Sequence, residues 1–241
     1  MFLMMLLVLL PSCRAHASQS PQTTKLRDNI LEAYGGSERL SQIQSVAAEG
    51  SITAIVRGDS GLYRRAWRKD GKLLVDIQYT RSRETRILNG QRTLRGVDGK
   101  IEDVSGPGAA AMIYQYNEIS MPFALLDETF EIEIRGRDMV DGVDVRVLRC
   151  TSRSGNRLDL FVSETTHRIM KARGSFSVNG RPATLSSEYD NFRFVQGILL
   201  PFRIVNYSGS IKISEISIEN YLINAPLNDS LFDPLAHIPQ Q

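Results

Sequence analysis

Residues 62–79 read LYRRAWRKDGKLLVDIQY, and this stretch predicts two antiparallel β-strands joined by a tight turn. Apolar and polar side chains alternate along its second half, which is the period of a strand with one buried face. Asp70 and Gly71 interrupt the alternation at the place where a hairpin turn would lie. One face is expected to carry Leu73, Val75, Ile77 and Tyr79 from the second strand, and Tyr63, Arg65 and Trp67 from the first.

The same two-residue period extends outward over most of the chain, from about residue 45 to 97 and again from about 130 to 222. Turn dipeptides such as Asn89-Gly90 separate the segments, which amount to about eleven strands. Helical periodicity is confined to residues 24–34, 37–43 and 109–126. Because strands and helices do not alternate, we predict a mainly β fold with α-helices: a single strongly curved antiparallel sheet, an unclosed β-barrel, covered by helices. Residues 18–241 are expected to form one domain of this kind.

Residues 197–210, GILLPFRIVNYSGS, place a proline inside one of the predicted strands. Proline has no amide proton and cannot donate a hydrogen bond within a ladder of strands. We therefore expect residue 201 to face a gap in the strand pairing, such as an edge, a bulge or a bend of an unclosed barrel. Phe202, the next residue, is expected to face the apolar interior.

The first ten residues, MFLMMLLVLL, are all apolar, and PSCRAHASQS follows. A run this short is typical of the apolar part of an export signal and is too short to span a bilayer. Two processing sites compete. Cleavage after Ala17 would remove residues 1–17 as a signal peptide, whereas a lipoprotein signal ending at Ser12 would make Cys13 a lipidated first residue. Because Pro11 is unusual in a lipoprotein signal, the first alternative is favoured. Both predict the periplasm, and the second adds a membrane anchor through Cys13.

Patterns for catalysis or metal binding are scarce. Of the three histidines, only His167 falls within the predicted strands, and no spacing of Cys and His supplies a metal cluster. The G-x-S-x-G nucleophile motif is absent. Cys150, which ends the apolar alternation VDVRVLRC, is expected to be a small buried residue. We therefore expect no enzyme, no metal and no cofactor. We also expect no nucleic-acid partner, because the net charge is only +2 and basic and aromatic residues are not interleaved.

Charge is distributed unevenly along the chain. Residues 57–95 contain eleven Lys or Arg and four Asp or Glu, whereas residues 98–144 contain eleven acids and three bases. One hypothesis is that the two regions lie side by side and neutralise each other. The other is that the basic region faces an anionic membrane surface or an acidic partner.

A curved sheet has a concave face on which aromatic side chains either form a core or line a ligand cavity. Packing is the commoner role for such residues, but apolar walls with few polar groups would also suffice to hold an acyl chain. The candidate lining residues, chosen from the side on which each is expected to point, are Tyr63, Trp67, Ile77, Tyr79, Met112, Phe123 and Phe202.

Two longer stretches resemble a known family. They are ILEAYGGSERLSQIQSVAAEGSI, residues 30–52, and YDNFRFVQGILLPFRIVNYSGSIKISEISIENYLINAPLNDSLFDP, residues 189–234. Together with the export signal they resemble the outer-membrane lipoprotein-sorting (LolA/LolB-like) superfamily and its uncharacterised bacterial relatives. The Tyr-Gly-Gly helix end, the GILLPF strand and the terminal LNDSLFDP carry the likeness.

The resemblance implies an unclosed barrel with a helical lid over a cavity for lipoprotein acyl chains, without an enzyme activity or a cofactor. We therefore expect an exported envelope protein, a monomer, that binds acyl chains of a lipoprotein or another lipid in a carrier or sorting role. The alternative is a non-carrier envelope scaffold of the same fold, whose core is filled by its own side chains.

Overall fold

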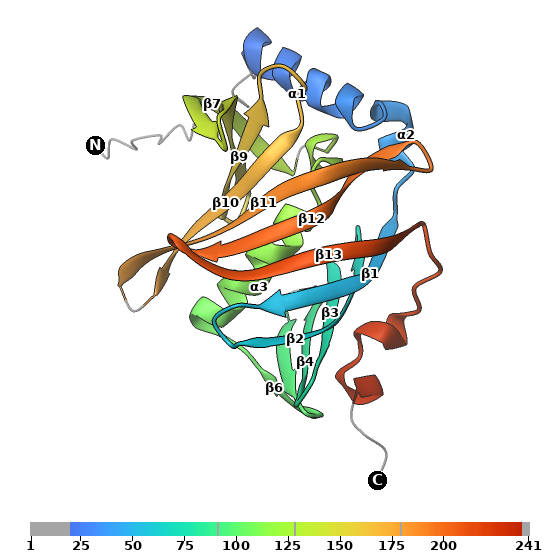
Figure 1. Cartoon of the computed structure of the whole chain (residues 1–241). Coiled ribbons are helices and arrows are strands. Elements are labelled where there is room, and N and C mark those ends of the chain that lie inside the picture. The colour runs from blue at the N-terminus through green and yellow to red at the C-terminus, as the bar shows by residue number, and fades with distance from the viewer. Residues whose placement is uncertain (1–19, 91, 128, 179, 238–241) are drawn as a thin grey trace, which may run out of the picture.

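The computed structural model describes residues 20–237 except 91, 128 and 179 (Figure 1). Within these residues the strands form one antiparallel thirteen-stranded sheet, in the order β6-β5-β4-β3-β2-β1-β13-β12-β11-β10-β9-β8-β7. The strands are β1 (Ser45–Ala54), β2 (Asp59–Arg68), β3 (Lys72–Tyr79), β4 (Arg83–Asn89), β5 (Arg92–Val97), β6 (Lys100–Asp103), β7 (Phe130–Val140), β8 (Val143–Ser152), β9 (Arg157–Ser163), β10 (Ile169–Val178), β11 (Arg181–Val195), β12 (Ile198–Ser208) and β13 (Ile211–Ile223). The helices are α1 (Pro21–Ala33), α2 (Ser37–Ser41) and α3 (Gly106–Ile119), with short 3-10 turns η1 (Phe123–Leu125), η2 (Asp229–Phe232) and η3 (Pro234–His237).

The sheet curves around α3, and this confirms the predicted fold class (Figure 1). β6 and β7 are its two edges, and in the described residues they do not pair with each other, so the barrel is unclosed. Helix α3 and η1 are the connection between these two edges. The chain therefore places α3 inside the curve simply by crossing from one edge to the other.

The predicted number of strands was too low. β6, with the sequence KIED, was not predicted because four mostly exposed residues do not show an apolar alternation.

The hairpin of β2 and β3 forms as predicted, with Arg68 opposite Lys72 and Trp67 opposite Leu73 across the turn. Tyr63, Trp67, Leu73, Val75 and Ile77 are all buried on the concave side of this hairpin.

Pro201 lies beyond the end of the pairing between β12 and β13, so one edge of its strand is unpaired there, as predicted. It is opposite Phe192 of β11, but pairing between β12 and β13 begins only at Arg203, opposite Ser217. Two residues earlier, and therefore on the same edge of the strand, Leu199 donates its amide to the Tyr34 carbonyl at 3.1 Å. The Pro201 carbonyl accepts a hydrogen bond from the Tyr221 hydroxyl at 2.6 Å. The missing proline N–H thus costs no ladder bond.

The main apolar core fills the concave face. Its centre is aromatic: Trp67 packs on Phe123 with a centroid separation of 5.6 Å, and Phe202 packs edge-on against Tyr221 at 5.2 Å. Phe202 is only 8% exposed, which confirms its predicted direction. Helix α1 contributes Ile30 and Leu31 to this core along the rim of the barrel seen at the top of Figure 1.

The tail after β13 packs on the opposite, convex face. Phe232 is completely buried there against Ala66, Leu74, Ile87 and Leu94. Lys72 binds the Asp229 carboxylate at 2.7 Å and so reinforces the contact. The described part of the tail therefore wraps the surface of the sheet.

Residues 1–19 lie outside the described part of the chain, and with them the predicted signal peptide, the two predicted processing sites and Cys13. Among the described helices, none combines the length and the apolar character needed to cross a membrane.

Candidate functional site

Helix α3 docks on the concave face through three polar side chains. Tyr114 lies with its hydroxyl 3.3 Å from the Ala172 carbonyl and from the Ser187 hydroxyl. Tyr116 donates to the Lys69 carbonyl at 3.0 Å and accepts from the Gly71 amide at 3.2 Å, so it holds the turn between β2 and β3. Burial raises the pKa of Tyr116 to about 12, so this phenol stays protonated and keeps its donor.

The third side chain is Glu118, a carboxyl group enclosed between α3 and the sheet. It is in hydrogen-bond contact with the Ser187 hydroxyl and, at 3.3 Å, with the Tyr189 hydroxyl. Burial raises the pKa of Glu118, and these hydrogen bonds offset only part of the effect. Ser187 also lies 2.8 Å from Asn206 Oδ1, yet it carries a single proton. Ser187 can therefore donate to only one of these two acceptors at a time.

Arg65 of β2 enters the same interior. Its guanidinium lies 3.3 Å from the Tyr221 hydroxyl and near the Glu118 carboxyl. Two buried side-chain nitrogens, Arg65 Nε and Trp67 Nε1, have no hydrogen-bond partner among the described residues. An unpaired buried donor is costly, so the interior retains unused capacity to bind an acceptor.

The enclosed space between these groups is small. A cavity of about 40 Å³ is lined by Arg65, Glu118, Tyr189, Pro201 and Ile204, among others. Ligand pockets usually measure roughly 300–1,000 Å³. In this conformation the centre of the barrel is therefore filled by its own side chains, and space for a ligand lies beside α3.

A groove of about 360 Å³ runs along one flank of α3, between the helix and the strands β4, β5 and β11–β13. Its apolar walls include Val104, Ala111, Met112, Leu185 and Ile213. Glu118 and Ser187 line its inner end, and Glu118 also lines the enclosed cavity. The groove therefore leads from the surface to the polar contact that docks α3.

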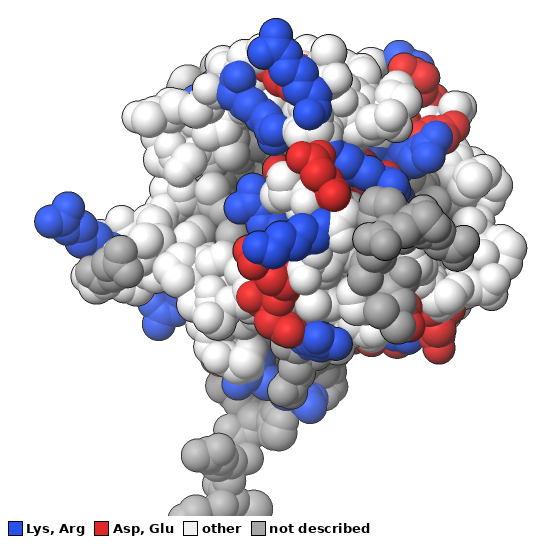
Figure 2. Space-filling view, turned by 90° about the horizontal axis from the view of Figure 1, so that it is seen from below, with Lys and Arg blue, Asp and Glu red and all other residues white. Residues whose placement is uncertain are grey.

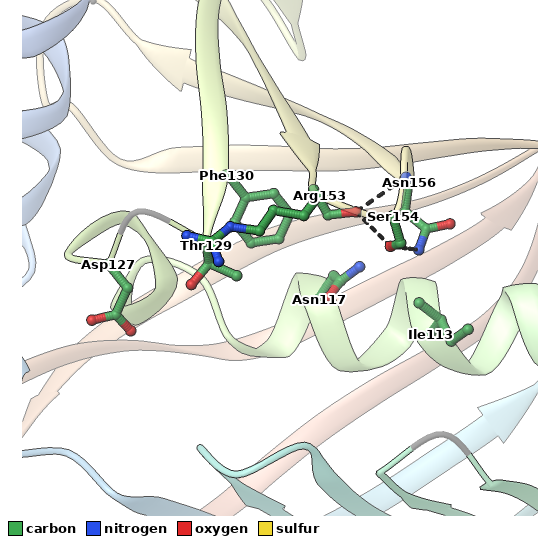
Figure 3. Close-up of a pocket in the computed structure, with 9 residues that line it drawn as sticks. Ile113, Asn117, Asp127, Thr129, Phe130, Arg153, Ser154 and Asn156 are labelled. Atoms are coloured by element: carbon green, nitrogen blue, oxygen red, sulfur yellow. Dashed lines mark hydrogen bonds between the residues drawn. The ribbon is translucent and has the colours of Figure 1, made fainter. Parts of the chain in front are cut away.

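A second hollow of about 560 Å³ lies on the other flank of α3 (Figure 3). Ile113 and Asn117 project into it from the helix, Asp127 and Thr129 come from the segment before β7, and Phe130 is the first residue of that strand. The turn between β8 and β9 supplies hydroxyl and amide groups, with Asn156 Nδ2 bonded to Ser154 Oγ at 2.9 Å. Its apolar lining residues are Ile113 and Phe130, so it offers a hydrocarbon chain fewer apolar side chains than the groove.

Charged side chains gather at the outer end of the groove. Glu84 of β4 is bonded to Arg86 at 2.7 Å and lies 3.4 Å from the Arg95 guanidinium of β5 and 3.7 Å from Arg57. Burial by itself would raise the pKa of Glu84, but Arg86 and Arg95 more than offset this and lower it. One carboxylate thus faces three guanidinium groups.

The structure brings the seven candidate lining residues to the interior side of the sheet. Tyr63, Trp67, Ile77, Tyr79, Phe123 and Phe202 all belong to the main core. Met112 is buried on α3 and lines the groove. Six of the seven therefore pack in the filled centre, and only Met112 lies in the groove beside α3.

The sequence analysis did not identify several of the polar residues around α3 as candidate site residues. Glu118 follows Tyr114 by one helical turn, a signal that both share a face. The turn at Asn89-Gly90 sets the pairing of Arg86 with Arg95, since Asn89 is opposite Arg92. Both signals are local and could have been used.

The two remaining chemical candidates are structural. Cys150 is buried in the main core, as predicted, and burial raises the pKa of its thiol to about 12. His167 sits in the turn before β10, where its Nε2 lies 3.3 Å from the Asn29 amide nitrogen. Among the described residues, no three His, Cys, Asp or Glu side chains are grouped to hold a metal ion.

Basic and acidic side chains are intermingled on the face seen from below in Figure 2. Among the described residues, two ion pairs join the basic region 57–95 to the acidic region 98–144, namely Arg92 with Asp103 and Lys69 with Asp127. Other arginines find partners within their own region, such as Arg83 with Asp76, or in the tail. Neutralisation between the two regions is thus real but partial.

Comparison with protein-family models and with curated proteins finds no match. Solved structures do match over most of the chain. A DUF1329 family protein from Desulfovibrio piger has a TM-score of 0.58 at 14% identity, covering 89% of this chain and 98% of that one. A LolA superfamily protein from Nitrosomonas europaea has a TM-score of 0.53 at 18% identity, covering 87% and 96%.

The protein has a LolA-like fold. A third match agrees, a structure from Vibrio parahaemolyticus described as an outer membrane lipoprotein-sorting protein domain. It has a TM-score of 0.57 at 12% identity and covers 89% of this chain and 97% of that one. At these identities the likeness concerns the LolA-like fold alone, so the chemistry of the groove has to be argued from this chain's own residues.

Proposed function

We propose that this protein binds the acyl chain of a lipoprotein or another lipid beneath α3, as a non-catalytic carrier in the cell envelope. The observation that carries the proposal is the groove of about 360 Å³ between α3 and the concave side of an unclosed barrel, with apolar side chains along part of its walls. Burying hydrocarbon would supply the affinity, at about 0.8 kcal/mol for each CH₂ group.

Deep insertion of a chain requires α3 to move, because the enclosed cavity measures only about 40 Å³. The helix is suited to movement, since its first turns, including Gly106 and Gly108, are exposed. Its docking also rests on a few specific contacts at Tyr114, Tyr116 and Glu118. A ligand that replaces the apolar contacts of α3 would recover much of the energy that its displacement costs.

The export signal supports placing this activity in the periplasm, either as a free monomer or attached to a membrane through Cys13. Intact mass measurement of protein extracted from membranes distinguishes the two. A lipidated Cys13 adds the mass of its acyl groups, whereas cleavage after Ala17 leaves an unmodified chain.

The direct test is binding of fluorescent acyl probes to delipidated protein. The chain's single tryptophan, Trp67, lies in the core against Phe123, so its emission also reports occupation of the interior. Saturable binding that is competed by unlabelled acyl chains is expected. Absence of binding to any acyl compound would refute the proposal.

The second candidate function is a scaffold without cargo, and the filled centre of the barrel favours it. The two candidate functions predict different results for a substitution that weakens the packing of α3 on the sheet. A carrier then binds acyl probes more readily, whereas a scaffold only loses stability.

A further inference from the structure

Three arginines occupy one level of the concave face. Arg65 of β2 is opposite Val75 of β3, Val75 is opposite Arg86 of β4, and Arg86 is opposite Arg95 of β5. Residues directly opposite one another in neighbouring strands point to the same side of the sheet. The three guanidinium groups therefore form a row from the buried interior to the surface, and Arg86 and Arg95 are 33% and 54% exposed.

Among the described residues, four arginines, counting Arg57, face three acidic side chains here: Glu84, Glu118 near Arg65, and Glu102 of β6 opposite Arg95. Glu84 is the carboxylate that Arg86, Arg95 and Arg57 share, and its side chain is only 6% exposed. Like charges directly opposite in a sheet are destabilising. Glu84 reduces this repulsion from one side, and a second anion on the groove side of Arg86 and Arg95 would reduce it further and would meet planar guanidinium groups suited to oxygen acids.

The same groove also offers hydrocarbon contact. Met112 and Ala111 of α3 face the groove, with Val104 at its wall. The first turn of α3 holds no acidic residue, and the Ser105 side chain makes no capping hydrogen bond to the described backbone. The arginines, the apolar wall and the positive end of α3 thus lie within one hollow.

We propose that the groove selects single-chain amphiphiles whose head group is an oxygen anion, a carboxylate or a phosphate, held by Arg86 and Arg95 while the hydrocarbon runs beneath α3. This inference rests on the proposed function and adds to it the charge of the head group. The groove measures about 360 Å³ and lies between α3 and the sheet, so a small head group on a flexible chain fits it better than a folded partner.

The test compares ligands that share one chain and differ in the head group: dodecyl phosphate, dodecanoate and dodecanol, with inorganic phosphate alone as a further arm. Binding is measured by calorimetry below the micellar concentration. The wild-type protein is expected to bind the two anions at least ~10-fold more tightly than the alcohol, as one or two charge-assisted hydrogen bonds would give.

The variant Arg86→Gln/Arg95→Gln should lose this preference and keep its affinity for dodecanol. The matched control Arg64→Gln/Arg81→Gln removes the same charge from exposed positions outside the groove and should keep the preference. If the double variant does not fold, Arg95→Gln alone replaces it, because the nearest contact between Arg95 and Glu84 is 3.4 Å and half of its side chain is exposed.

Equal affinity of the wild-type protein for the anions and the alcohol would overturn the inference while leaving the proposed function intact. An equal loss of the preference for anions in the control variant would overturn the inference as well, because the net charge of the protein would then explain that preference. If inorganic phosphate binds as tightly as dodecyl phosphate, the arginines are a free-anion site and the amphiphile inference is wrong. Failure of all three chains to bind would refute the proposed function itself.

Discussion

The carboxyl group of Glu118, on the helix inside the barrel, is in hydrogen-bond contact with the hydroxyl of Ser187, on strand β11. Sixty-nine positions separate the two residues in the chain. The contact joins α3 to the sheet at the inner end of the groove, so it couples docking of the helix to the protonation of one carboxyl group.

Glu118 should make the stability of the protein depend on pH. Its pKa is raised above the usual value of 4.5, so its contribution is complete below that value and declines as pH rises through the raised pKa. Glu118→Gln keeps the side chain neutral and should remove this part of the pH dependence. Thermal unfolding between pH 4 and 8 measures it, with the exposed Glu131→Gln as control. Parallel profiles for wild type and Glu118→Gln would contradict this prediction.

Gly174 leaves room for the ring of Tyr114. A methyl group at position 174 would lie 2.3 Å from Tyr114 Cδ2, so Gly174→Ala should push α3 away from the sheet and cost about 1–3 kcal/mol. Faster hydrogen exchange across residues 106–119 and tighter binding of acyl probes are expected. Combining Gly174→Ala with Tyr114→Leu should cost less than the sum of the single changes, because the clash is absent. Strict additivity would show that the ring is not what the methyl group meets.

Phe232 fastens the tail to the convex face. Its side chain is completely buried, so Phe232→Ala should lower the free energy of unfolding by about 3–5 kcal/mol. The affinity for acyl probes of the protein that remains folded should stay unchanged, because the groove lies on the other side of the sheet. Denaturant unfolding and probe titration measure the two effects. A large loss of affinity would place the tail in the binding mechanism.

Asp159 should produce the opposite pH dependence. Burial alone would raise its pKa, but hydrogen bonds from Arg149 and Arg173 lower it overall. Its contribution is therefore present above the usual pKa of 3.8 and is lost as pH falls through the lowered value. Asp159→Asn should cost about 1–3 kcal/mol at neutral pH and less in acid. Unfolding curves at pH 7 and pH 3 test it, and an equal cost at both would count against the ion pair.

The sheet could be predicted in detail because its information is local. Alternation at Leu73, Val75 and Ile77 assigns the buried face of one strand, and the turn at Asp70-Gly71 orients its neighbour. Pro201 even marked the point where pairing with β13 ends, since a missing N–H is a local property. The short edge strand β6 was missed because four mostly exposed residues have no buried face to reveal their period.

The candidate site was predictable only in part. The inward direction of Tyr63, Trp67 and Phe202 followed from alternation, but the same alternation describes a packed core and a ligand cavity equally well. Which of the two forms depends on the volume that remains after α3 docks. That volume is set by the curvature of the whole sheet and by contacts between distant residues.

The sequence alone determined the antiparallel strands, the faces they bury and the helical segment that connects the two edges, because side-chain period and turn chemistry act over a few residues. Only the tertiary structure decided that Glu118 meets Ser187, that aromatic side chains fill the centre of the barrel, and that Arg86 and Arg95 lie in a groove beside α3. Those relationships depend on how far thirteen strands curve before the chain crosses the gap, and this curvature is the sum of small twists along the entire sheet.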